Sequence, residues 1–179
     1  MPWSVGDLLF IVVVAMIIYG IMALVNRSRQ AHPANIPPVP DPGAGDFMLR
    51  SILTEGRTIA LVGASPDPDQ PSHQIMNYLQ AAGYTVWPIN PTVSTVLGQP
   101  AFGALEELPQ SADIVDVFPG SGEIPAIARA AITSGVGTLW LQPGIDSPEG
   151  VQAARQAGLK VVVDHCIMQE HQRLLRDRR

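Results

Sequence analysis

The chain has 179 residues, of which 46% are hydrophobic, and a formal net charge of -5 at pH 7. This length suits one domain of ordinary size with a short appendage. The small negative charge and the scattered basic residues exclude a basic nucleic-acid-binding face, so we expect no nucleic-acid partner. The single cysteine, Cys166, excludes an internal disulfide framework.

The apolar segment LLFIVVVAMIIYGIMALV, residues 8–25, contains no charged residue. As a helix it is ~27 Å long, close to the hydrocarbon thickness of a bilayer. Asp7 precedes it and Arg27 and Arg29 follow it, whereas a cleaved signal peptide has basic residues before its apolar part. We therefore predict one transmembrane helix that anchors the protein in a membrane. Because basic residues favour the cytoplasmic side, we expect the N-terminus outside and the C-terminal domain in the cytoplasm.

Residues 26–46 form a linker with prolines at positions 33, 37, 38, 40 and 42. Proline-rich segments favour the extended polyproline II conformation, so the linker is predicted to hold the next domain away from the membrane. The sequence IPPVP within it could also bind an aromatic groove of a protein partner. The identity of any protein partner therefore stays open.

The remaining residues, 47–179, alternate short apolar runs with helical patterns. Five runs have the continuous hydrophobicity of strands that are covered on both faces of a sheet, and they span 58–63, 84–90, 113–118, 137–144 and 159–164. Helices are predicted over 72–83, 123–135, 147–158 and 168–176, with a shorter helix or turn over 104–108. Ser72 and Ser147 are the expected N-caps of two of them.

Strands that alternate with crossover helices form a parallel sheet with right-handed connections. The predicted fold class is therefore α/β: a Rossmann-like five-stranded parallel sheet with helices on both faces, preceded by one transmembrane helix. In such sheets ligands bind beyond the carboxyl ends of the strands. The loops that matter are 63–72, 90–98, 118–123, 142–148 and 164–168.

The first of these loops has features of a phosphate-binding turn. Gly63 lets the backbone approach a ligand closely, and Ser65 can donate its hydroxyl to a phosphate. The amides around Ser72 and His73 open a helix, whose positive dipole end favours an anion. Pro66 stiffens the loop but supplies no amide donor.

Recognition of NAD usually requires three spaced glycines and an acidic residue at the end of the second strand. This chain has one glycine in the first loop, and its second predicted strand ends at Asn90, followed by Pro91. These residues argue against standard NAD recognition, although Asn90 could still bind a nucleotide. An NAD(P)-linked Rossmann enzyme remains an alternative.

Five segments occur in order over about residues 55–175: IALVGAS, PSHQIMNYLQAAGYTVWPINP, ADIVDVF, WLQPG and AGLKVVVDHC. Together they resemble the stand-alone CoA-binding domain family, which is related to the N-terminal domain of the succinyl-CoA synthetase alpha subunit. The resemblance implies that this domain binds CoA or an acyl-CoA. The nucleotide is then expected near the residues that match the family motifs: Gly63, Ala64, Ser65, Asn90, Pro91 and Phe118.

The chain departs from the family pattern in charge. Members often carry Arg or Lys in the first loop and directly after the VDVF segment, where this chain has Asp67, Gln70 and Pro119. Each charge-assisted contact to a CoA phosphate that is lost would weaken binding by ~1 to 3 kcal/mol.

Other residues at the strand ends have two interpretations. Trp140 is expected in the core, with Gln142 and Gly144 at the ligand edge. Asp164 could orient a ligand or cap the turn that follows it, and His165 and His171 are predicted to be surface or helix-entry residues.

Cys166 precedes the last predicted helix, where a helix N-terminus lowers the pKa of a thiol. It could act as a thiol or acyl carrier, or it could be a small buried side chain.

No His and acidic pair has the spacing of a catalytic triad or a metal site, so no catalytic residue is assigned. We predict a membrane-tethered binding module for CoA or acyl-CoA without a catalytic centre of its own. The candidate ligand-binding residues are Gly63, Ala64, Ser65, Pro66, Ser72, His73, Asn90, Pro91, Phe118, Gln142, Gly144 and Cys166.

Overall fold

A computed structural model describes residues 45–120 and 122–175. The predicted transmembrane segment, 8–25, and nearly all of the linker lie outside these residues. Among the described helices, none combines the length and the apolar character needed to cross a bilayer. The membrane anchor therefore stays a prediction.

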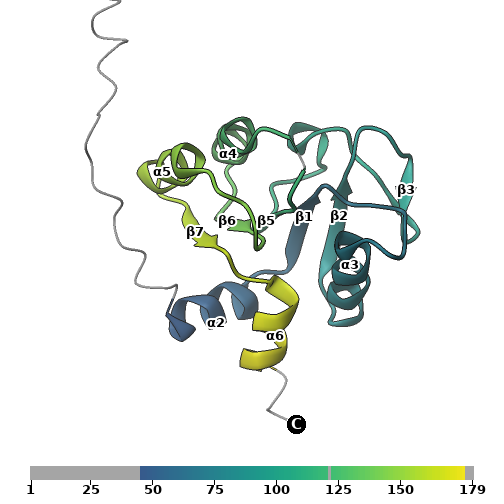
Figure 1. The fold of residues 1–179 in the computed structure, drawn as a ribbon, viewed down its shortest axis with the longest axis horizontal. Helices are drawn as coiled ribbons and strands as arrows, with labels where there is room; N and C mark the ends of the chain where they lie inside the picture. Colours follow the sequence, from purple (N-terminus) through teal and green to yellow (C-terminus); the bar gives the residue numbers. More distant parts are fainter. Residues whose placement is uncertain (1–44, 121, 176–179) are drawn as a thin grey trace, which may run out of the picture. The chain divides into compact units, whose positions relative to one another are not determined.

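The core of the domain is a parallel five-stranded sheet with the order β2-β1-β5-β6-β7 (Figure 1). Its strands are β1 (Thr58–Val62), β2 (Thr85–Ile89), β5 (Ile114–Val117), β6 (Thr138–Leu141) and β7 (Lys160–Val163). Each strand lies within a range predicted from its apolar run, which confirms the α/β Rossmann-like sheet. A small antiparallel hairpin of β3 (Thr95–Val96) and β4 (Gln99–Pro100) was not predicted.

The predicted helices are present as α3 (Pro71–Ala81), α4 (Ile124–Thr133), α5 (Pro148–Gln156) and α6 (Ile167–Leu175), and the short turn is a 3-10 helix, η1 (Leu105–Glu107). A further helix, α2 (Asp46–Glu55), precedes the sheet. It was not predicted, and its first residue belongs to the segment assigned to the linker.

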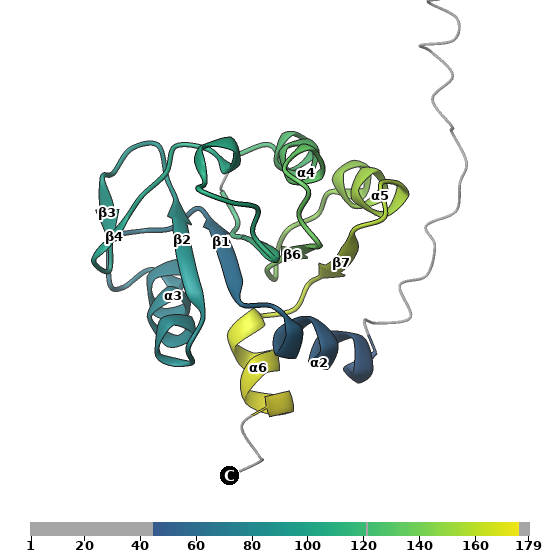
Figure 2. The same cartoon turned by 180° about the vertical axis from the view of Figure 1, so that it is seen from behind.

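Helices cover both faces of the sheet, as predicted (Figures 1 and 2). One buried cluster joins the sheet to α2, α3 and α6 through Leu53, Met76 and Leu174. A second buried cluster joins the opposite face to α4 and α5 through Ala128 and Ala154. Because both faces are buried, the strands need continuous rather than alternating hydrophobicity.

Of the two predicted helix N-caps, one is confirmed and one is wrong. Ser147 caps α5, because its Oγ accepts a hydrogen bond from the Gly150 amide at 3.3 Å. The predicted cap Ser72 is wrong: α3 begins at Pro71, after Gln70, and Ser72 is buried within the first turn. Proline suits the first helical position because its fixed φ is helical and no amide hydrogen is needed there.

Trp140 is fully buried, as predicted. Its Nε1 donates a hydrogen bond to the His165 carbonyl at 2.7 Å, so the indole also fixes the loop between β7 and α6.

Ion pairs connect α6 to α2: Arg173 of α6 contacts Asp46 of α2 at 2.7 Å and Glu170 at 2.6 Å. These ion pairs are partly exposed and contribute little stability, so α2 is held on α6 mainly by apolar packing.

Candidate ligand-binding site

The strand order places the ligand edge between β1 and β5. The chain passes from β1 to β2 on one side and from β5 to β6 and β7 on the other. In a doubly wound sheet the crevice at this reversal, beyond the carboxyl ends of the strands, is where ligands bind. The loops that begin at Gly63 and at Phe118 therefore form the centre of the candidate site.

The loop after β1 makes a sharp turn at Gly63, whose φ is 88°. A residue with a side chain adopts this conformation only with strain, so the position favours glycine. The Gly63 amide donates to the Ile89 carbonyl at 3.1 Å, and Ala64 is fully buried. The floor of the site is thus bare backbone rather than side chain.

Two side chains hold this loop from neighbouring elements. Asn90 Nδ2 donates to the Ala64 carbonyl at 2.7 Å, and Asn90 Oδ1 accepts hydrogen bonds from Thr92 N at 2.9 Å and Thr92 Oγ1 at 2.7 Å. His73 of α3 donates from Nδ1 to the Ser65 carbonyl at 3.0 Å. Both polar ends of the Asn90 amide are occupied within the protein. Asn90 and His73 therefore shape the loop, whatever contact they make with a ligand.

Replacing Asn90 tests this role. Asn90→Asp keeps the acceptor for Thr92 but places an oxygen against the Ala64 carbonyl, where a donor is required. We expect the free energy of unfolding to fall by about 1 to 3 kcal/mol in urea titrations. Thr92→Val, which removes the outer contact alone, should cost about 1 kcal/mol or less. Equal losses in the two variants would contradict the role assigned to the Asn90 donor.

The remaining candidates of the first two loops differ in exposure. Pro66 and Pro91 are exposed at the rim of the site, Ser65 is half-buried and Ser72 is buried. The Ser65 hydroxyl accepts a hydrogen bond from the Asp67 amide at 3.2 Å. Its own hydrogen is still able to point towards a ligand.

The loops after β5 and β6 lie side by side. A Cβ atom added to Gly144 would lie 3.9 Å from Pro119 Cγ, and Gly144 itself has a φ of 88°. Phe118 is buried in the core cluster shared with α3 and α6. Gln142 is only 3% exposed, and its Nε2 donates to Asp116 Oδ1 at 2.8 Å. The Gln142 donor therefore points into the sheet rather than into the crevice where it was predicted.

Asp116 is the main feature that the sequence analysis did not single out. It is fully buried in the central strand β5, and its Oδ2 has no hydrogen-bond partner in the described part of the chain. Burial raises the pKa of this carboxyl to about 7, against the opposing effect of the hydrogen bond from Gln142. The signal available in the sequence was an acid, Asp116, between the apolar residues Val115 and Val117 of the run DIVDVF.

Cys166 lies directly before α6, half-buried against the apolar core. The neighbouring histidines contact other side chains: His165 Nδ1 lies 3.2 Å from Glu170 Oε1, and His171 Nδ1 lies 2.7 Å from the Tyr78 hydroxyl oxygen. Partial burial lowers the pKa of His171. His171 is half-buried in the middle of α6, in contact with Tyr78 and Tyr84, rather than at the helix entry.

The ligand edge carries no basic side chain. The loops after the five strands contain no Lys or Arg, whereas they contain acids at Asp67, Asp69, Glu123, Asp146 and Asp164. Positive potential at this edge must come from backbone amides and from the N-termini of α3, α4 and α5. No group of His, Cys, Asp or Glu in residues 45–120 and 122–175 is arranged to hold a metal ion.

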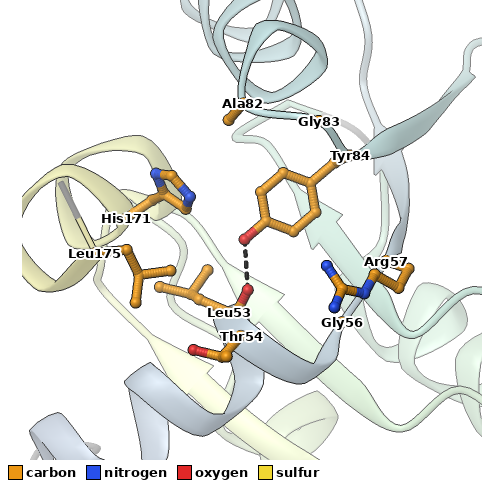
Figure 3. A pocket seen from close by; sticks show the side chains of 9 residues that line it. All are labelled: Leu53, Thr54, Gly56, Arg57, Ala82, Gly83, Tyr84, His171 and Leu175. Carbon is orange, nitrogen blue, oxygen red and sulfur yellow. Dashed lines mark hydrogen bonds between the residues drawn. The ribbon is translucent and has the colours of Figure 1, made fainter. Parts of the chain in front are cut away.

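A hollow of about 240 Å³ lies at the other end of the sheet (Figure 3). Arg57 and Tyr84, which line it, directly precede β1 and β2, so it is at the amino ends of these strands. The Tyr84 hydroxyl donates to the Leu53 carbonyl at 2.6 Å, and burial raises its pKa to about 12. This hollow contains none of the predicted ligand-binding residues. Its lining residues are Leu53, Thr54, Gly56, Arg57, Ala82, Gly83, Tyr84, His171 and Leu175.

The domain has a doubly wound sheet, with a glycine turn and bare backbone at the point where the strand order reverses. These features define a small Rossmann-like domain of the nucleotide-binding type. Residues 57–172 match the CoA binding domain family. This match includes all five strands of the parallel sheet, and the chain belongs to this family.

Relatives of the chain include proteins that it matches over nearly their whole length and ligases that it matches over a small part of theirs. It is 35% identical to the uncharacterized protein YneT of Bacillus subtilis over 69% of this chain and 91% of YneT. A solved structure, a hypothetical protein from Pyrococcus horikoshii OT3, is 36% identical with a TM-score of 0.73, covering 79% of this chain and 98% of that one. The alpha subunit of acetate–CoA ligase (ADP-forming) II from Pyrococcus furiosus is 28% identical over 62% of this chain but only 27% of its own length.

Proposed function

We propose that this protein binds CoA or an acyl-CoA at the crevice between β1 and β5, as a membrane-tethered module without a catalytic centre of its own. The observation that carries the proposal is the family match over residues 57–172, which spans every loop of the ligand edge. The larger relatives named as CoA ligases share this region and extend far beyond it. Binding, rather than chemistry, is therefore the property that we assign to the shared region.

The shape of the ligand edge supports this proposal. Gly120 and Gly122, in the loop after β5, have positive φ angles, and a Cβ atom added to either would meet no atom within 4 Å. This open backbone, together with the turn at Gly63 and the start of α3, offers amide groups to the phosphates of CoA. The absence of Lys and Arg from these loops implies modest affinity for so acidic a ligand.

The test is calorimetry on residues 45–179 with CoA, acetyl-CoA, NAD and NADP. The Pyrococcus horikoshii relative aligns over 98% of its own length, so a domain of this size can exist without a preceding segment. We expect saturable heat with CoA or acetyl-CoA, and thermal stabilisation that grows with ligand concentration. At a hundredfold excess over the dissociation constant the gain is about 2.7 kcal/mol. Binding of NAD without binding of CoA would contradict the proposal.

The membrane tether rests on the apolar segment 8–25 and on the two arginines that follow it. We expect the full chain to remain in the membrane fraction after an alkaline carbonate wash, and a chain starting at residue 45 to be released. Val14→Arg with Ile17→Arg should release it as well, whereas Val14→Leu should not. A C-terminal tag on the full chain should resist external protease until the membrane is opened. Release of the full chain by carbonate would contradict the tether.

A further inference from the structure

Asp116 has an unusual place among the buried groups. Its side chain is fully buried, and Oδ2 is the one buried side-chain nitrogen or oxygen in residues 45–120 and 122–175 without a hydrogen-bond partner. Its other oxygen accepts a single hydrogen bond, from Gln142 Nε2. A carboxylate in this position would lack most of the donors that water supplies, so the neutral acid is favoured.

The surroundings of Asp116 supply no charge to compensate it. Its register neighbours on the adjacent strands are Leu61 and Trp140, both fully buried. The titratable side chains packed on this face of the sheet include Tyr78 from α3, Tyr84 directly before β2, Cys166, and His171 from α6, whose pKa is lowered by burial. The helix α2 contributes apolar residues to the cluster. Burial raises the pKa of Asp116 to about 7, and the hydrogen bond from Gln142 lowers it only in part.

The Asp116–Gln142 pair lies directly beneath the candidate ligand edge. Asp116 is two residues before Phe118 in β5, and Gln142 is two residues before Gly144. The backbone amide of Gln142 also donates a hydrogen bond to the Val117 carbonyl at 3.0 Å. Backbone and side chain of Gln142 thus both tie the end of β6 to β5, where the two loops begin.

We propose that Asp116 is a positioning residue which holds the β5 and β6 loops through Gln142 as a neutral acid, and that binding of an anionic ligand at this edge is coupled to uptake of a proton by Asp116. The inference rests on the proposed function. When the negative phosphates of CoA are bound at this edge, they disfavour the negative charge of an ionised Asp116 in the low-dielectric interior nearby. Near neutral pH the free protein is partly ionised at Asp116, so the complex takes up the missing fraction of a proton.

The test is calorimetry of CoA binding to the full chain in detergent at pH 6 and pH 8. The parent protein should bind about tenfold more weakly at pH 8, because ionised Asp116 must first be neutralised. At pH 7.5, titrations in two buffers of different ionisation enthalpy should show uptake of more than about half a proton. Asp116→Asn should lose both effects, and Asp146→Asn, which removes an exposed acid at the same edge, should keep them.

The phosphate groups of CoA titrate in the same way with every variant, so the difference between parent and Asp116→Asn isolates the protein group. If that variant fails to fold, the two-buffer measurement on the parent still decides. Gln142→Leu removes the hydrogen bond that lowers the pKa of Asp116, so less carboxylate is present in the free protein and proton uptake at pH 7 should decrease. A parent that takes up no proton, or a variant whose pH dependence matches the parent within about twofold, overturns the coupling alone. Absence of CoA binding by the parent at both pH values overturns the proposed function and the coupling with it.

Discussion

Replacing Asp116 by Asn should remove a loss of stability that depends on pH. When the pH rises from about 4.5 to 8, the free energy of unfolding of the variant, relative to that of the parent, should increase by about 3 kcal/mol. In the folded parent the pKa of Asp116 is raised from 3.8 to about 7, mainly by burial. Between these values the folded state binds more protons than the unfolded state. Its free energy of unfolding therefore falls as the pH rises through this window, and the contribution of Asp116 is constant above it.

Asparagine has no carboxyl group to titrate, so this loss of stability is absent from the variant. The carbonyl oxygen of the asparagine side chain can still accept the hydrogen bond from Gln142. Its NH₂ group, however, takes the place of Oδ2, which has no partner in the parent. A buried donor without an acceptor costs about 1 to 3 kcal/mol at every pH. We therefore expect the variant to be less stable than its parent under acidic conditions and as stable or more stable at pH 8.

Urea unfolding of residues 45–179 at several pH values measures this difference directly. Other titrating groups are the same in both proteins and cancel in the comparison. Asp146→Asn, in which an exposed acid is removed, should leave the pH dependence of the parent in place. Parallel stability curves for parent and Asp116→Asn would show that Asp116 is not the group that gains a proton on folding.

The fold was predictable because each strand of a doubly covered sheet carries its own signal. The runs that became β1 and β6 are apolar on every residue except for threonines at their starts. The predicted strands were too long by up to three residues at an end. Gly63 turns the backbone to positive φ directly after β1, whereas β6 ends at Leu141, before the glycine turn at Gly144. Those glycines mark loops more clearly than they mark the last residue of a strand.

The helix α2 was missed because its sequence signals are weak. Gly45, its N-cap, makes no side-chain cap, and the helix follows a proline-rich segment. Its apolar residues Leu49, Ile52 and Leu53 become buried only through contact with the rest of the core, including Leu174 of α6. Helices of this length are stable through tertiary packing rather than propensity, and a partner as far along the chain as Leu174 leaves no local signal in the sequence of the helix.

The places of the candidate residues at the strand ends were predictable, but the contacts of their side chains were not. The sequence placed Asn90 and Gln142 at strand ends, which is correct, and suggested that they face a ligand. The structure turns the Asn90 donor towards the Ala64 carbonyl and the Gln142 donor towards Asp116. These contacts join residues from different strands, so they depend on strand order and register, which no local pattern specifies.

Pro119→Arg should strengthen CoA binding by about tenfold, which corresponds to about 1.4 kcal/mol. Pro119 is exposed beside Gly144 at an edge that has no Lys or Arg. A guanidinium there can pair with a CoA phosphate through charge-assisted hydrogen bonds. The gain should be smaller than for a buried pair, because exposed charges are screened by water and salt.

Pro119→Gln is the matched control, since it also removes the proline but adds no charge. Calorimetry should show the gain with CoA for the Arg variant alone, and the gain should shrink as salt is added. Pantetheine, which has no phosphate, should bind both variants equally. A gain of similar size with pantetheine, or with Pro119→Gln, would mean that loop flexibility rather than charge limits affinity. The missing positive charge would then no longer explain weak binding at this edge.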